Sequence, residues 1–230
     1  MGASKLTISR EDLRETLLIY EKRDIEALPG RTNHLPGAVL IPIELGEDCT
    51  CIVTVRPKAL RLHSGEVVFP GGGPESQDGN LKETALRETR EELGLSEIEV
   101  LGELSSIPLY TSDYRLHPFV GIVDDGDKIM PNSAEVESVH RLSLNDYLTR
   151  DFIHAIAVRI PEKPIHLSPV FEVADRLMFG GTAYAFYELL TIIAKRYERA
   201  APPLKTGKYV LSDILSGASD ENIYGGAQTK

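Results

Sequence analysis

A glycine- and proline-rich cluster directly precedes the best-bounded helix that this sequence predicts. Pro70-Gly71-Gly72-Gly73-Pro74 cannot lie in a strand interior or begin a helix directly, so we expect a loop there. From Asn80 to Leu93 every residue tolerates or favours a helix, and Gly94 stands where a left-handed cap is expected. We therefore expect a glycine-rich loop followed by a short helix.

Three glutamates share one face of this helix. With 3.6 residues per turn, Glu88, Glu91 and Glu92 converge, and their mutual repulsion requires a counter-cation. Arg87 supplies one positive charge, and a hard divalent cation supplies two. Carboxylate oxygens suit Mg²⁺ or Mn²⁺, whereas zinc prefers Cys and His. The alternative is a solvated helix face, but the preceding glycines allow a bound polyanion to approach the backbone, which favours a metal site.

The composition is that of an ordinary globular protein. The 230 residues are 42% hydrophobic and 26% charged, and 25 basic against 35 acidic side chains give a net charge of −10. This charge argues against a broad basic surface for duplex nucleic acid or anionic lipid. We therefore expect a small-molecule partner, with no nucleic acid and no membrane.

The sequence also predicts a cytoplasmic location. No apolar run is long enough to span a membrane, and the first residues lack the apolar run of a signal peptide. Cys49 and Cys51 are two positions apart on an expected strand, where a mutual disulfide is geometrically awkward. We expect both cysteines to be reduced.

Hydrophobic periodicity divides the chain into three parts. We predict an N-terminal helix and link over residues 1–35, a main domain over 36–200 and a loosely ordered tail over 201–230. Further predicted elements are helices at 9–22, 145–153 and 182–197, and strands at 38–43, 51–55, 67–69, 100–107, 117–123 and 140–144.

The stretch from Gly73 to Leu95 resembles the Nudix box of hydrolases that cleave a nucleoside diphosphate linked to another group. Its second half matches R-E-U-x-E-E-x-G-U, with Thr89 in a position that is usually apolar. The acidic residue expected before the spacer falls on Gly79, while Asp78 lies one position early. The resemblance implies a Nudix hydrolase with an α/β fold, a Nudix-type α/β/α sandwich with a mixed β-sheet.

An upstream segment resembles the coenzyme A pyrophosphatases of that superfamily. Ile52 to Pro57, Arg61, Gly65 and Phe69 to Gly72 keep the spacing L-L-T-x-R-[SA]-x₃-R-x₃-G-x₃-F-P-G-G, although Pro57 replaces a small residue. The resemblance implies metal-dependent cleavage of coenzyme A or its derivatives to 4′-phosphopantetheine and adenosine 3′,5′-bisphosphate. Pro57 keeps ADP-ribose, nucleotide sugars and nucleoside triphosphates open as substrates. A catalytically inactive nucleotide-binding regulator is a third alternative, against which the intact glutamates argue.

The same resemblance implies roles for particular residues. The expected metal ligands for Mg²⁺ or Mn²⁺ are Glu88, Glu92, Glu91 and the carbonyl of Gly72. The expected catalytic residues are Glu91, Arg87 and Glu135, and the expected substrate-binding residues are Arg56, Arg61, Gly71 and Phe69. Candidates for stacking on a base or lining a pantetheine channel are Tyr110, Tyr114 and Phe179, with packing in the core or at its rim as the alternative for each. The resemblance also admits a homodimer.

Overall fold

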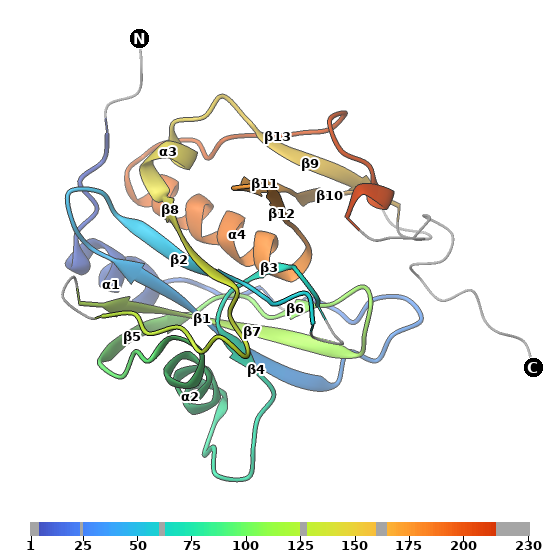
Figure 1. Ribbon diagram of the computed structural model, residues 1–230. Helices are drawn as coiled ribbons and strands as arrows, with labels where there is room; N and C mark the ends of the chain where they lie inside the picture. Colours follow the sequence, from blue (N-terminus) through green and yellow to red (C-terminus); the bar gives the residue numbers. More distant parts are fainter. Residues whose placement is uncertain (1–4, 24, 60–62, 125–127, 160–164, 215–230) are drawn as a thin grey trace, which may run out of the picture.

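The computed structural model describes residues 5–23, 25–59, 63–124, 128–159 and 165–214, and its centre is a mixed β-sheet (Figure 1). Among these residues the sheet has eight strands, five of which follow the order β3-β2-β1-β7-β5. β1 (Leu35–Glu44) and β7 (Tyr114–Val123) run parallel, and the other pairs are antiparallel. The other strands are β2 (Thr50–Val55), β3 (Val67–Val68), β4 (Gly71–Gly72), β5 (Ile98–Glu103), β6 (Ile107–Pro108) and β8 (Ser138–Ser143). The α/β class with a mixed sheet is confirmed.

Helices cover both faces of the sheet because its central strand is apolar on both sides. In β1, Val39, Ile41 and Ile43 belong to the main core beneath α1 (Arg10–Leu18), α3 (Leu144–Leu148) and α4 (Gly180–Arg196). The alternate residues Ala38 and Leu40 point to the opposite face, where they pack with Ala85 of α2 (Leu81–Leu93). Figure 1 shows α4 and α2 on opposite sides of the sheet.

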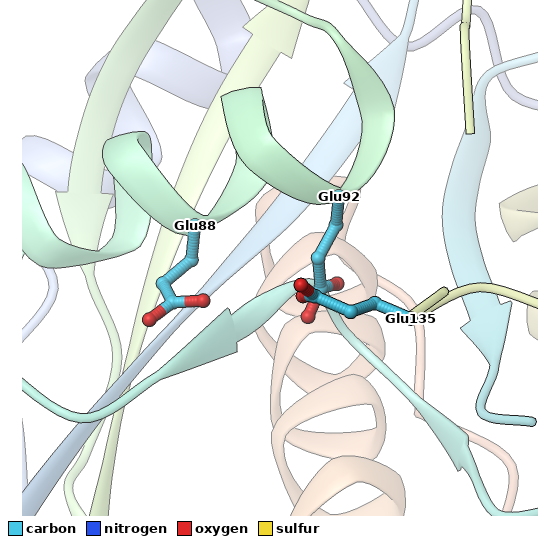
Figure 2. Close-up of side chains that lie close together, drawn as sticks. All are labelled: Glu88, Glu92 and Glu135. Atoms are coloured by element: carbon cyan, nitrogen blue, oxygen red, sulfur yellow. The ribbon is translucent and has the colours of Figure 1, made fainter. Parts of the chain in front are cut away.

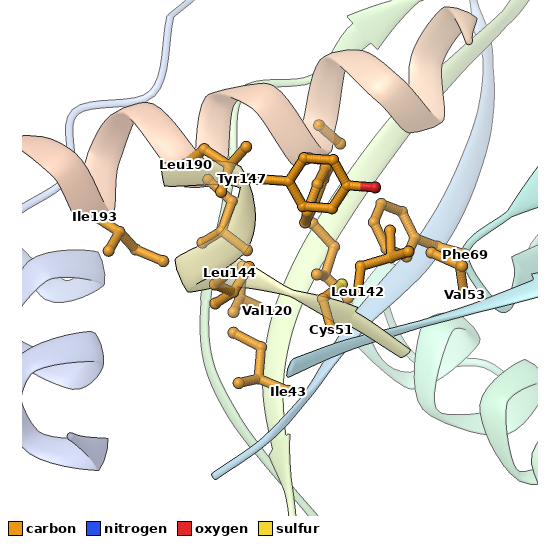
Figure 3. Close-up of a cluster of buried hydrophobic side chains, with 14 of the residues drawn as sticks. Ile43, Cys51, Val53, Phe69, Val120, Leu142, Leu144, Tyr147, Leu190 and Ile193 are labelled. Carbon is orange, nitrogen blue, oxygen red and sulfur yellow. The ribbon is translucent and has the colours of Figure 1, made fainter. Parts of the chain in front are cut away.

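The main core lies between the sheet and α4. Figure 3 shows sheet residues such as Ile43 and Val120 on one side of this cluster and Leu190 and Ile193 of α4 on the other. Cys51 is fully buried in the same cluster, and both cysteines are free thiols, as predicted. Burial raises the pKa of the Cys49 thiol to about 12.

The glutamate helix, α2, has the ends that its sequence predicts. The side chain of Asn80 accepts a hydrogen bond from the Glu83 amide at 3.1 Å, which caps the N-terminus. Gly94 adopts a left-handed conformation (φ 73°) and donates its N–H to the carbonyl of Arg90. Thr89 is fully buried in the usually apolar slot, where its hydroxyl donates to the carbonyl of Ala85 at 2.7 Å.

The predicted glycine loop is partly a strand. β4 pairs with β1 through Ala38 opposite Gly72 and Val39 opposite Gly71. A Cβ atom at Gly71 would lie 2.3 Å from the carbonyl oxygen of Ala38, so only glycine fits this close backbone approach. The prediction of a loop across the whole cluster was therefore wrong at these two residues.

The region after β8 contains strands that the sequence did not predict. β9 (Ile153–Val158) pairs with β10 (His166–Pro169) and with β13 (Leu204–Lys205). β11 (Phe171–Val173) and β12 (Arg176–Met178) form a separate hairpin, and the 3₁₀ turn η1 (Leu211–Asp213) follows β13. The predicted helices at 9–22 and 145–153 are shorter than expected, ending at Leu18 and Leu148. Part of the predicted tail, residues 215–230, lies outside the described residues.

Candidate active site

Three carboxylates converge at the C-terminal half of α2 (Figure 2). One oxygen of each of Glu88, Glu92 and Glu135 lies within 4.8 Å of the other two. Figure 2 shows Glu88 and Glu92 on the same side of α2, while Glu135 reaches toward Glu92 from a separate segment. Sequence spacing predicts the first two as neighbours, and the tertiary fold adds the third.

The segment that carries Glu135 is attached to both α2 and β2. The amide of Asn132 donates to the carbonyl of Glu92 at 2.9 Å, and the amide of Glu137 donates to the carbonyl of Val55 at 2.7 Å. These backbone hydrogen bonds flank Glu135 on both sides. Its side chain is therefore placed by the same elements that place Glu92.

Glu92 is a buried carboxylate with incomplete partners. Its exposed fraction is 2%, its Oε2 atom has no hydrogen-bond partner, and Nη1 of Arg56 lies 3.8 Å from its Oε1 atom. Burial raises the pKa of Glu92 to about 8, and the charges of Glu88 and Glu135 act in the same direction. Burial also raises the pKa of Glu88. Converging carboxylates, one of them with an unpartnered buried oxygen, fit a hard divalent cation.

Arg87 links the glycine segment to the helix. Its guanidinium donates to Asp78 at 3.0 Å, to Glu88 at 3.0 Å, to Glu91 at 3.1 Å and to the carbonyl of Gly73 at 3.0 Å. This guanidinium holds the pKa of Asp78 down at about 2. Asp78 thus reaches Arg87 although it lies one residue early in the motif.

Glu91 lies apart from the three-carboxylate group. Its side chain is 50% exposed and pairs with Arg87. Gly72, in contrast, lies directly against the group, because a Cβ atom there would be 2.3 Å from Oε1 of Glu88. The geometry favours Glu135 over Glu91 as the third metal ligand, and it leaves Glu91 facing solvent beside the site. These roles stay predictions.

Three of the four predicted substrate-binding residues lie beside the same site. The Nε atom of Arg56 is buried without a hydrogen-bond partner, and the N–H of Gly71 donates to Glu92. Phe69 is buried in the main core and also lines the adjacent cavity. Pro57 follows the end of β2, so its missing N–H removes no hydrogen bond from the sheet. Arg61 lies outside the described residues.

A cavity of about 350 Å³ adjoins the site. The predicted aromatic residues Tyr110, Tyr114 and Phe179 all line it, so the fold brings them together from two distant parts of the chain. Leu211 and Ile214 also line it, which no motif in the sequence indicates. Their only local signal is that apolar residues recur in a stretch otherwise typical of a tail.

Comparison with known proteins assigns the family. The model of the NUDIX domain matches residues 34–160, more than half of the chain. The chain belongs to the Nudix family. An uncharacterised Nudix hydrolase, NudL, from Photorhabdus laumondii is 36% identical over 160 residues, which cover 68% of this chain and 84% of that protein. The NudL protein of Yersinia enterocolitica is 40% identical over 118 residues, 50% of this chain and 60% of that relative.

The Nudix assignment accounts for the motif seen in the sequence. The matched range contains the glycine segment, α2 and Glu135. Among solved structures, a MutT/nudix family protein from Enterococcus faecalis aligns with a TM-score of 0.44 and 10% identity, over 83% of this chain and 70% of that chain. Such a distant alignment carries no information about substrate.

Proposed function

We propose that this Nudix protein is a metal-dependent pyrophosphohydrolase that cleaves the diphosphate of coenzyme A or its derivatives. The products are 4′-phosphopantetheine and adenosine 3′,5′-bisphosphate. The observation that carries the proposal is the group of Glu88, Glu92 and Glu135, with all three oxygens within 4.8 Å. The coenzyme A part is supported by the resemblance of the 52–72 segment to coenzyme A pyrophosphatases, and Arg56 and Gly71 of this segment border Glu92.

The proposed cofactor is Mg²⁺ or Mn²⁺, held by the three carboxylates and by the carbonyl of Gly72. When bound, the ion neutralises charge on the diphosphate, lowers the pKa of a bound water and stabilises the leaving phosphate. The buried oxygen of Glu92 without a partner is the feature that most favours such an ion.

The residues around the carboxylates have separate roles in substrate binding, orientation and proton transfer. Arg56, with an unpaired buried Nε atom, donates hydrogen bonds to the diphosphate. Arg87 orients Glu88 and Glu91 and holds the Gly73 carbonyl, which fixes the glycine segment against α2. Glu91 is half exposed beside the site and accepts the proton of the attacking water.

A substrate panel tests this proposal. The protein is incubated with Mg²⁺ or Mn²⁺ and coenzyme A, acetyl-coenzyme A, ADP-ribose, a nucleotide sugar or dGTP, and the products are separated by chromatography. We expect coenzyme A to give 4′-phosphopantetheine, and Glu92→Gln to lose the activity by several orders of magnitude. Cleavage of another substrate alone would overturn the coenzyme A assignment, and cleavage of none would favour the inactive regulator.

Two variants separate the roles of the other carboxylates. Glu135→Gln is expected to weaken binding of Mn²⁺ measured by calorimetry, because Glu135 belongs to the converging group. Glu91→Gln is expected to lower the rate while keeping the affinity for Mn²⁺. The opposite result would make Glu91 the third ligand.

A cytoplasmic location and a homodimer complete the proposal. None of the described helices is both long and apolar enough to cross a bilayer. Fractionation of cells tests the location. Light scattering of the purified protein tests the dimer, and a measured mass equal to that of one chain would contradict it.

A further inference from the structure

The lining of the cavity beside the carboxylates contains a polar group of residues and a separate apolar group, which we call its polar end and its apolar end. At the polar end lie Arg56 and the backbone of Gly72, which also border the carboxylate group. At the other end lie Val158 of β9, Leu211 of η1 and Ile214. One cavity therefore joins a site for phosphate to an apolar surface.

The apolar end is a packed wall. Leu211 is 8% exposed and packs with Ile156, Val158 and Val170 in a small separate core, against which Ile214 also lies. Among the described cavity residues that β9, β10, η1 and the start of α4 contribute, none carries a charge. A charged group entering this end would lose its hydration without gaining a partner.

The volume decides how much of a substrate fits. About 350 Å³ lies at the lower end of the range for small-molecule pockets, so the cavity holds one part of a coenzyme A-sized molecule. This part is the arm attached to the diphosphate. The arm enters at the polar end of the cavity, and its far end contacts the apolar wall.

We propose that the apolar end of this cavity binds an acyl chain carried by the substrate, and that Leu211 and Ile214 set the preference for acylated substrates. The acyl chain is bound without reacting, because the bond cleaved is the phosphoanhydride at the other end. This inference rests on the proposed function for the position of the diphosphate. The two residues come from the C-terminal segment, beyond the matched Nudix range of 34–160.

The expected signature is a dependence on chain length. Burial of each methylene corresponds to at most about a fourfold gain in kcat/KM, so we expect a two- to fourfold rise per methylene until the chain fills the cavity. Substrates of increasing chain length, from acetyl- through butanoyl- and hexanoyl- to octanoyl-coenzyme A, measure this rise on the full chain.

Two variants of neighbouring residues form a matched pair. Ile214→Asp places a charge in the cavity wall and is expected to flatten the dependence on chain length. Val210→Asp places the same charge on a side chain that is 59% exposed and does not line the cavity, and it is expected to keep the dependence. Thermal unfolding of both variants verifies that they fold.

Calorimetry separates this inference from the proposed function. Binding of S-hexanoyl-4′-phosphopantetheine needs no cleavage, and we expect it to be at least tenfold weaker in Ile214→Asp than in Val210→Asp. If no coenzyme A derivative is cleaved but this difference in binding remains, the proposed function fails and the acyl site stands. Equal chain-length dependence in the two variants, or cleavage of coenzyme A with no effect of chain length, would overturn the acyl site.

Discussion

The buried carboxylate of Glu92 should make the metal-free protein less stable than its own charge-neutral variant. Glu92 is 2% exposed, and burial raises its pKa from an ordinary 4.5 to about 8. Between these pH values the unfolded chain carries an ionised Glu92, whereas the folded protein holds it protonated. Folding therefore takes up a proton, so the free energy of unfolding falls as the pH rises from 4.5 to about 8 and levels off above that.

The magnitude follows from the same pKa. At about 1.4 kcal/mol for each pKa unit, the rise to about 8 corresponds to at most about 5 kcal/mol of lost stability. Glu92→Gln removes this loss, but it also removes the negative charge that faces Arg56 at 3.8 Å. We therefore expect the variant to be more stable by about 2–4 kcal/mol above pH 8, which raises Tm by about 5–10 °C for a chain of this size.

Thermal unfolding in EDTA at pH 5 and pH 8.5 measures the effect. The wild type should lose stability between the two pH values, and Glu92→Gln should lose less. Glu91→Gln is the matched control, because its side chain is half exposed and outside the three-carboxylate group. Adding Mg²⁺ should stabilise the wild type at pH 8.5 and leave Glu92→Gln nearly unchanged. A variant no more stable than the wild type at pH 8.5 would refute the reasoning.

Three further changes test the supports of the site. Gly72→Ala should weaken Mn²⁺ binding at least tenfold in calorimetry, because the added Cβ would displace the Oε1 atom of Glu88, which lies 2.3 Å away. Gly73→Ala is the control and should bind Mn²⁺ normally, because its Cβ would meet no atom within 4 Å. Equal affinities of the two variants would contradict this prediction. Arg176 donates hydrogen bonds to Glu137 at 3.1 Å and to the Gly65 carbonyl at 3.0 Å. Because Glu137 belongs to the segment that carries Glu135, Arg176→Met and Glu137→Gln should each weaken Mn²⁺ binding about three- to tenfold. The double variant should be no weaker than the worse single one, and full additivity would show that the pair does not act together. Arg87→Lys should lower kcat about 10- to 100-fold in the hydrolysis assay, because an ammonium group cannot bridge the four groups that the guanidinium holds. A variant with the kcat of the wild type would exclude this bridging role.

Local sequence predicts the parts of the site that lie on one element. The cap residues Asn80 and Gly94 fix the ends of α2, and helical spacing then places Glu88 and Glu92 on one face. These are short-range effects of backbone conformation and hydrogen bonding, which the sequence shows directly. The glycines at 71 and 72 predict a loop that a polyanion can approach, but their pairing with β1 depends on residues 32 to 34 positions earlier in the chain (Val39 with Gly71, Ala38 with Gly72).

Long-range packing decided which distant residues join the site and line the cavity. The sequence alone determined the Nudix motif, the acidic helix and the continuous apolar run that makes β1 apolar on both faces. Only the tertiary structure decided that Glu135, rather than Glu91, joins the carboxylate group, and that Leu211 lines the cavity. Both outcomes depend on backbone pairing and side-chain burial between segments far apart in the chain, and no local propensity encodes which distant partner a residue will meet.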